Sequence, residues 1–175
     1  MDKKKIITIS AICIAVIGVV IILIVSLGNG NKLVCTKTTN ENGIEIKDKI
    51  SFILEDKKVG KVEVEKNLEI KDDSINAKTF LKALTTTLEN AYSYASENAY
   101  EIETNEDKKT LTLIMNSKKY GVILDNIKVN KNESGNYSFN AVSNIETAKN
   151  AIKIGDTYKK SELKDKAKEV GYKCK

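Results

Sequence analysis

The chain has 175 residues, with 29 basic and 24 acidic side chains, and every basic residue is lysine. Its formal net charge is +5, and histidine, proline and tryptophan are absent. Without histidine, Ser-His-Asp and Cys-His catalytic arrangements are excluded. Without arginine or a basic stripe carrying aromatic residues, the sequence is not that of a nucleic-acid-binding protein.

An uninterrupted apolar run covers residues 6–27, directly after three consecutive lysines. About 20 apolar residues in a helix cross the hydrocarbon core of a bilayer, and preceding lysines favour a cytoplasmic N-terminus. We therefore expect a single-pass protein of the cell membrane. Its expected segments are a cytoplasmic tail (1–5), a transmembrane signal anchor (6–27), a short linker (28–32) and an extracytoplasmic domain (33–175).

The alternative to an uncleaved anchor is a signal peptide removed after Gly28. The apolar core of a signal peptide usually has only about 7–15 residues, so the length of the run favours the anchor. Lipid attachment would need a cysteine just after the apolar core and behind a small residue. Cys13 lies inside the run and Cys35 follows Val34, so neither fits.

The first strand is expected at residues 33–38 and contains Cys35; Cys174 is the penultimate residue of the chain. These two are the only cysteines outside the apolar run. In an oxidising compartment, an even pair at the two ends of a domain favours an internal disulfide. Free thiols and intermolecular bridges are the alternatives. The spacing matches neither a zinc site nor a redox motif.

Apolar residues then alternate with polar ones, which predicts a long β-hairpin. Its strands begin at Ile44 and Val59 and are separated by the polar turn 55–58. The inward apolar residues are Ile44, Ile46, Ile50, Phe52, Leu54, Val62, Val64, Leu68 and Ile70.

The spacing changes to three and four residues over 75–95, which predicts an amphipathic helix capped by Asp73 or Ser74. A second hairpin is expected from 100–104 and 109–116. A strand is expected from Tyr137 to Val142, and residues 120–129 suggest another without settling it.

Two short helices are expected near the C-terminus, at 145–152 and 161–170, the second ended by Gly171. Tyr172–Cys174 should then extend beside the first strand. The predicted fold class is α+β: an N-terminal transmembrane helix followed by one domain with an antiparallel β-sheet covered by helices.

The two ends of the predicted outer domain carry short motifs, Leu33-Val34-Cys35-Thr36-Lys37 and Gly171-Tyr172-Lys173-Cys174-Lys175. With the long hairpin and the last helix, they resemble the small YehR-like exported proteins and lipoproteins of Gram-positive bacteria. This resemblance implies an α+β outer domain and a disulfide between Cys35 and Cys174, but no activity. It covers 33–95 and 145–175; residues 117–140 look like an insertion, and the expected anchor replaces the family's lipid-modified cysteine.

Few residues of the sequence are candidates for catalysis or metal binding. Ser161 and Lys164 stand in a Ser-x-x-Lys spacing that a lysine-rich surface helix produces by coincidence. The carboxylate pairs Asp72-Asp73 and Glu101-Glu103 fit a helix start and a solvated strand face better than a glycosidase site. The acidic loop at 105–107 is too short to hold calcium. We expect no catalytic residue, cofactor or metal.

The tyrosines Tyr92, Tyr94 and Tyr100 are a candidate binding surface, although ordinary amphipathic packing is the favoured explanation for them. The leading hypothesis is a non-enzymatic binding or envelope-associated domain. The alternatives are a carrier or sensor that shelters a lipid or other apolar ligand between sheet and helix, and an envelope hydrolase. The sequence identifies no protein, lipid or wall-polymer partner.

Overall fold

The computed structural model describes residues 31–175, and residues 33–175 form one compact unit. The predicted tail, anchor and cleavage position at 1–28 lie outside the described residues, as does most of the linker. The strands are β1 (Lys32–Glu41), β2 (Ile44–Glu55), β3 (Lys58–Ile70), β4 (Tyr100–Asn105), β5 (Thr110–Ser117), β6 (Val122–Ile123), β7 (Ile127–Lys131), β8 (Tyr137–Ala141), β9 (Ala151–Ile152) and β10 (Lys173–Cys174). The helices are α2 (Ala77–Ala91), the 3₁₀ turn η1 (Glu97–Ala99) and α3 (Lys160–Glu169).

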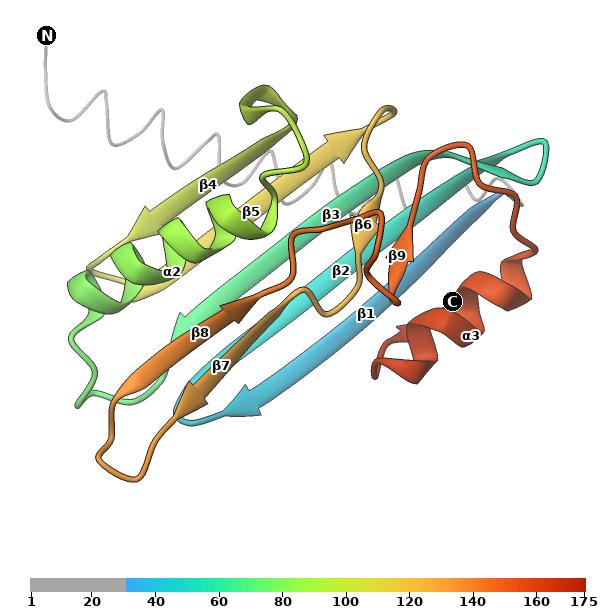
Figure 1. Cartoon of the computed structure of the whole chain (residues 1–175). Helices are drawn as coiled ribbons and strands as arrows, with labels where there is room; N and C mark the ends of the chain where they lie inside the picture. Colours follow the sequence, from blue (N-terminus) through green and yellow to red (C-terminus); the bar gives the residue numbers. More distant parts are fainter. Residues whose placement is uncertain (1–30) are drawn as a thin grey trace, which may run out of the picture. The chain divides into compact units, whose positions relative to one another are not determined.

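Six strands form one sheet in the order β10-β1-β2-β3-β5-β4, and the pairs β6-β9 and β7-β8 form two small sheets. The pairings with a defined register are all antiparallel. Figure 1 shows α2 over the β4–β5 end of the large sheet and the β7–β8 hairpin beside α2, in the same layer. The large sheet thus has one face covered by this mixed layer.

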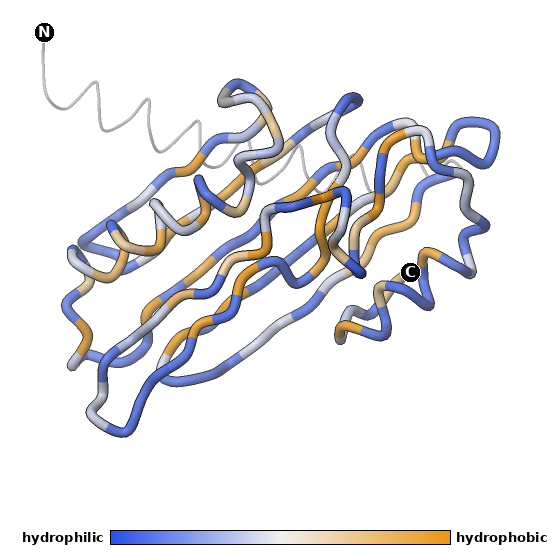
Figure 2. Tube along the Cα trace, viewed as in Figure 1, coloured by the Kyte–Doolittle hydropathy of each residue, from blue (hydrophilic) through white to orange (hydrophobic). Residues whose placement is uncertain are grey.

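The long hairpin forms as its alternation predicts. Leu68 pairs with Ile46 and Val64 with Ile50, and all four side chains point to the covered face. Figure 2 shows this alternation of hydrophobic and hydrophilic residues along the strands. Between β1 and β2, Asn42 and Gly43 both have positive φ (55° and 75°), which is the backbone of a two-residue type I′ hairpin turn.

Helix α2 packs its apolar stripe on the sheet through five buried residues: Phe80, Leu81, Leu84, Leu88 and Ala91. Its N-cap is Asn76, whose side chain accepts a hydrogen bond from the Thr79 N–H at 3.0 Å. The predicted caps Asp73 and Ser74 lie before the helix and make other contacts. Asp73 forms an ion pair with Lys109, and the Ser74 backbone N–H donates to Asp72. The helix is therefore shorter at both ends than the predicted 75–95.

The predicted fold class is wrong. The described residues form a mostly antiparallel sheet structure with two helices, and the layer over the large sheet is itself partly β. Among residues 31–175, no helix is long and apolar enough to cross a membrane.

The expected helix at 145–152 does not form. Asn144 Oδ1 accepts hydrogen bonds from the N–H groups of Glu146 and Thr147, and a single turn follows. A helix of eight residues is marginal alone, because nucleation is costly and Asn and Thr have low helix propensity. Ile152 is fully buried as part of β9, where it pairs with Val122 of β6. Burial and strand pairing thus override the helical spacing.

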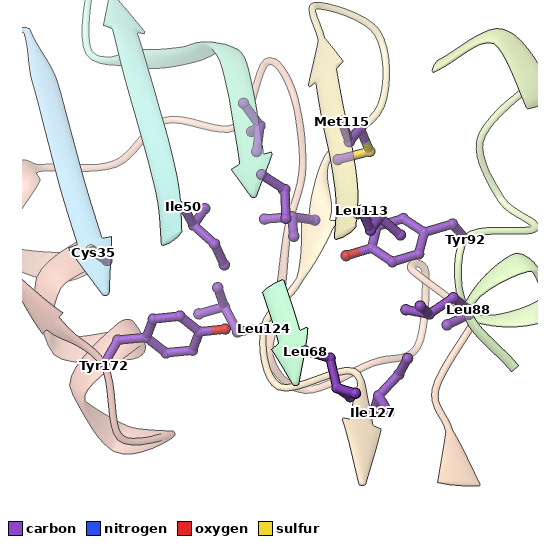
Figure 3. Close-up of a cluster of buried hydrophobic side chains, with 14 of the residues drawn as sticks. Cys35, Ile50, Leu68, Leu88, Tyr92, Leu113, Met115, Leu124, Ile127 and Tyr172 are labelled. Carbon is purple, nitrogen blue, oxygen red and sulfur yellow. The ribbon is translucent and has the colours of Figure 1, made fainter. Parts of the chain in front are cut away.

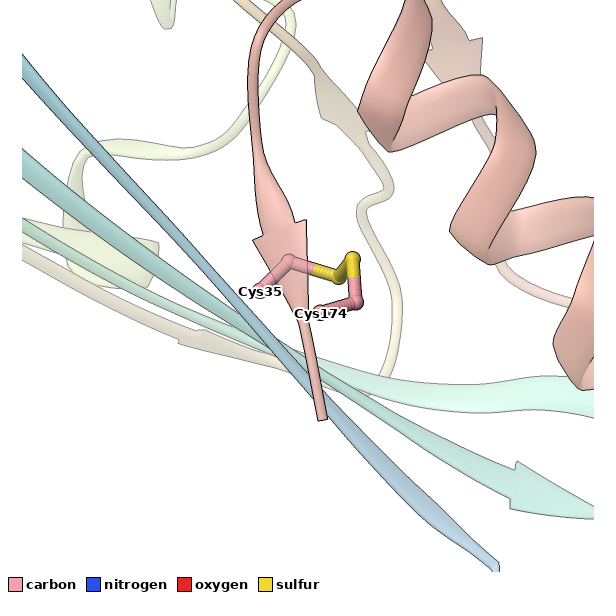
Figure 4. The surroundings of a disulfide bond; sticks show 2 residues. All are labelled: Cys35 and Cys174. Atoms are coloured by element: carbon pink, nitrogen blue, oxygen red, sulfur yellow. A yellow bond between two sulfur atoms is a disulfide. The ribbon is translucent and has the colours of Figure 1, made fainter.

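The disulfide between Cys35 and Cys174 is confirmed, and Figure 4 shows it joining β1 and β10. Val34 and Lys175 exchange two backbone hydrogen bonds, so the adjacent cysteines form a non-hydrogen-bonded pair. Facing side chains approach most closely at such a pair, and the two Cα atoms are 4.0 Å apart. The bridge holds the last residues of the chain against the first strand.

Candidate functional site

A buried ion pair lies on the covered face of the large sheet. Asp48 of β2 and Lys66 of β3 are register partners, and the Nζ–Oδ1 distance is 2.6 Å. Their residues are only 7% and 6% exposed, and they occupy inward positions that the surrounding pattern gives to apolar side chains. Removing two charges from water costs several kcal/mol for each ion, which the attraction between them offsets only in part.

A second ion pair connects β1 to the turn after β6. Lys37 Nζ lies 2.7 Å from Asp125 Oδ1, and both side chains are about one fifth exposed, at 19% and 25%. Asp125 has a left-handed backbone (φ 54°), which aspartate adopts more readily than most residues. The turn thereby brings a carboxylate, 88 residues away in the chain, to the lysine of the first strand.

Tyr172 joins the two ion pairs. Its hydroxyl donates a hydrogen bond to Asp48 Oδ2 at 3.1 Å, and Lys37 Nζ lies 5.8 Å from the centre of its ring. Burial, followed by the negative charge of Asp48, raises the pKa of Tyr172 far above its usual range. The hydroxyl therefore stays protonated and acts as a donor.

The disulfide positions this tyrosine. Cys35 faces Cys174, and continuing the same register places Lys37 opposite Tyr172. The covalent bond thus lies two residues from both members of the lysine–tyrosine contact. The disulfide that joins the two ends of the domain therefore also holds Tyr172 beside Lys37 and within hydrogen-bond distance of Asp48.

Tyr92, at the end of α2, enters the core from the other side. Figure 3 shows the hydroxyl groups of Tyr92 and Tyr172 both directed toward the middle of the core. Tyr92 is 1% exposed, and burial raises its pKa well above the usual range. The Asn126 amide faces the Tyr92 hydroxyl, but with the described residues its Nδ2 makes no hydrogen bond of normal geometry. The polar groups of the core are therefore not all satisfied.

The two ion pairs line a pocket of about 290 Å³ between the sheet and β7. We call it the charged pocket and define it by its charged residues Lys37, Glu41, Asp48, Lys66, Asp125 and Lys128. Apolar side chains of β2 and β7 complete the wall. The ammonium and carboxylate groups of the two ion pairs, two of each sign, thus lie at one small volume.

The tyrosines predicted as a binding surface lie against one another. The Tyr92 ring centre is 6.0 Å from that of Tyr94 and 5.7 Å from that of Tyr100. The Tyr94 hydroxyl donates to the Gly121 carbonyl at 3.4 Å, and burial raises the pKa of Tyr94. Only Tyr94 and Tyr100 are partly exposed, so the three rings do not form one open surface.

The remaining candidates are dispersed. Asp72 and Asp73 bind different partners, Glu101 and Glu103 are exposed on β4, and Ser161 and Lys164 are exposed on α3. Hydrogen bonds from Ser74 lower the pKa of Asp72. In the part of the chain that the structure describes, no group of three or more Cys, Asp or Glu side chains could hold a metal ion.

The charged pocket was not predicted from the sequence, although the long hairpin carries one signal of it. Among the alternating inward positions of the long hairpin, the apolar series is interrupted at Asp48 and at Lys66. A charge at an inward position of each strand indicates a buried ion pair when the register makes them partners. The contacts to Asp125 and Tyr172 have no such local signal.

Comparison of the chain with protein-family models, with curated proteins and with solved structures found no match. The resemblance of the terminal motifs to the YehR-like proteins therefore stays a prediction.

Proposed function

We propose that this protein is a non-enzymatic binding protein whose domain works outside the cytoplasm and captures a small polar solute in the charged pocket. The observation that carries the proposal is the ion pair between Asp48 and Lys66, buried on a mostly apolar sheet face. Replacing such a pair with well-packed hydrophobic residues is often neutral or stabilising, so the fold alone does not require it. A ligand that uses these charges supplies a reason for the pair.

The arrangement favours a ligand with one positive and one negative group. Lysine ammonium groups and aspartate carboxylates lie in the same pocket, so an amino and a carboxylate group on one small molecule could each meet an opposite charge. The volume of about 290 Å³ is near the lower end for small-molecule sites, which suits a molecule of amino-acid or dipeptide size.

The same contacts speak against catalysis in this pocket. Lys66 and Lys37 each lie in an ion pair with an aspartate, so neither side chain is free to act as a nucleophile. The two aspartates are engaged by these lysines, whereas a glycosidase needs one carboxylic acid that donates its proton.

Two further features support an extracytoplasmic location and a polar rather than an apolar ligand. The disulfide is of the kind that persists in oxidising compartments, in agreement with the expected extracytoplasmic location. The alternative of a carrier for an apolar ligand requires space between α2 and the sheet. Leu81, Leu84 and Leu88 fill that layer and are at most 2% exposed.

The test is calorimetric titration of the full-length protein in detergent with glycine, alanine and a dipeptide. Acetate and ethylammonium, which carry one charge each, are the controls. We expect zwitterions to bind and the single-charge controls to bind at least about tenfold more weakly. The double variant Asp48→Leu/Lys66→Met should stay folded and lose binding. No binding by any zwitterion, or full binding by the double variant, would contradict the proposal.

A further inference from the structure

Strand β4 ends the large sheet. In the sheet order it follows β5, and among residues 31–175 it has no partner strand on its other side. An edge strand presents backbone N–H and C=O groups that a further strand can bind. This edge lies at the α2 end of the sheet, away from β10 (Figure 1).

The hydrogen-bond pattern identifies which residues of β4 face outward. The Ile70 N–H donates to the Lys109 carbonyl at 2.9 Å, so the even-numbered residues of β3 bond to the odd-numbered residues of β5. The even-numbered residues of β5 then bond to their partners in β4, which are Glu101, Glu103 and Asn105. The backbone groups of Ile102 and Thr104 consequently point away from β5, toward the edge.

A groove runs along this edge. It has a volume of about 730 Å³ and is lined by Thr85, Glu89 and Ser93 from α2 and the segment after it, and by Tyr100 and Ile102 from β4. The side chains of Tyr100 and Ile102 are partly exposed toward it. An edge strand with a helix alongside and a groove between them is suited to binding an extended peptide.

The charges at the edge select the occupant. Glu101 and Glu103 are exposed, point to the opposite face from the groove, and form no ion pair within residues 31–175. A strand added to β4 would place alternate side chains next to these carboxylates, and opposite charges stabilise such cross-strand pairs. In a second copy paired antiparallel about Ile102, Glu101 would face Glu103, and like charges disfavour that pairing.

We propose that β4 and α2 form a docking site for an extended segment of a partner protein that carries Lys or Arg at alternate positions. The segment adds to β4 as a further antiparallel strand. Its basic side chains lie beside Glu101 and Glu103, and its other side chains enter the groove. This site is separate from the charged pocket and does not depend on the function proposed for that pocket.

The probe is a synthetic peptide, Lys-Val-Lys-Thr-Lys-Val-Lys, titrated into the full-length protein by fluorescence anisotropy. We expect saturable binding that weakens at high salt, and binding at least about tenfold weaker for the same peptide with Glu in place of Lys. A peptide methylated at alternate backbone nitrogens should also bind about tenfold more weakly, because it cannot pair with the edge. This measurement uses the unaltered protein and is independent of any folding defect.

Variants localise the binding. Thr104→Pro removes an outward N–H without touching the hydrogen bonds to β5, and should weaken binding about tenfold. Thr104→Val keeps the N–H and the branched side chain and should bind as the wild type. Glu101→Lys/Glu103→Lys should reverse the preference to the Glu peptide. Equal binding of both peptides, no effect of backbone methylation or of Thr104→Pro, or a dimer that buries β4 in sedimentation experiments would overturn the proposal.

Discussion

Removing the charged partners Asp48 and Lys66 one at a time should destabilise the domain far more than removing both together. In Lys66→Met, the Asp48 carboxylate stays at a site that is 7% exposed, and among residues 31–175 the Tyr172 hydroxyl is its one remaining hydrogen-bond donor. An uncompensated buried charge of this kind costs about 3–5 kcal/mol. For a domain of this size, about 3 kcal/mol lowers the Tm by about 9 °C.

The double variant Asp48→Leu/Lys66→Met behaves differently. The new apolar side chains sit between Ile46 and Ile50 on β2 and between Val64 and Leu68 on β3, so they extend an existing apolar surface. The remaining penalty is the Tyr172 hydroxyl, which loses its acceptor at a cost of about 1 kcal/mol. We therefore expect the free energy of unfolding of the double variant to lie within about 2 kcal/mol of that of the wild type.

The assay is urea unfolding followed by circular dichroism for the wild type, both single variants and the double variant. The resulting cycle should give a coupling free energy of at least about 2 kcal/mol. Single variants that each cost less than about 1 kcal/mol would show that the pair is solvated. Additive single effects would show that the two residues do not act as a pair. Either result would refute the account of the charged pocket.

Three further predictions follow from individual contacts. Reduction of the disulfide, which joins residues 139 positions apart, should lower the free energy of unfolding by up to about 5 kcal/mol. The measurement is the urea midpoint with and without reductant, and the Cys35→Ser/Cys174→Ser variant is the control. An unchanged midpoint in reductant would contradict this prediction. Because burial raises the pKa of Tyr92 and Tyr172, the stability that their neutral hydroxyls contribute is fully present below pH about 10 and is lost as the pH rises above the pKa of unfolded tyrosine. Ultraviolet titration should accordingly show these two tyrosines ionising only on unfolding, and Tyr172→Phe should lessen the alkaline loss of stability. Gly121→Ala places a Cβ 2.1 Å from a carbonyl oxygen of β9 and should cost about 1–3 kcal/mol in urea unfolding, whereas Gly155→Ala meets no atom within 4 Å and isolates the backbone effect of its positive φ.

Local patterns determined most of the strands. Alternating apolar residues predict β2 and β3, and the hairpin from β4 to β5 lies within one or two residues of the predicted bounds. These predictions succeed because the period of two is set by the strand backbone itself and is readable in a short window. The prediction for the layer that covers the sheet was wrong for the opposite reason. In residues 145–152 the helical spacing competes with the burial of Ile152 against β6, which no short window contains.

The cysteine pair could be predicted from the sequence, whereas the contacts of the charged pocket could be known only from the tertiary structure. From the sequence, the number of cysteines and the expected oxidising compartment favoured a disulfide between Cys35 and Cys174 over free thiols or intermolecular bridges, and the structure confirms it. The inward charges at Asp48 and Lys66 were visible as interruptions in a pattern. The hydrogen bond from Tyr172 to Asp48, 124 residues away, exists only because β10 returns beside β1. Tertiary structure alone decided that site, since a buried charge acquires its partner from whichever segment the fold brings within hydrogen-bond distance.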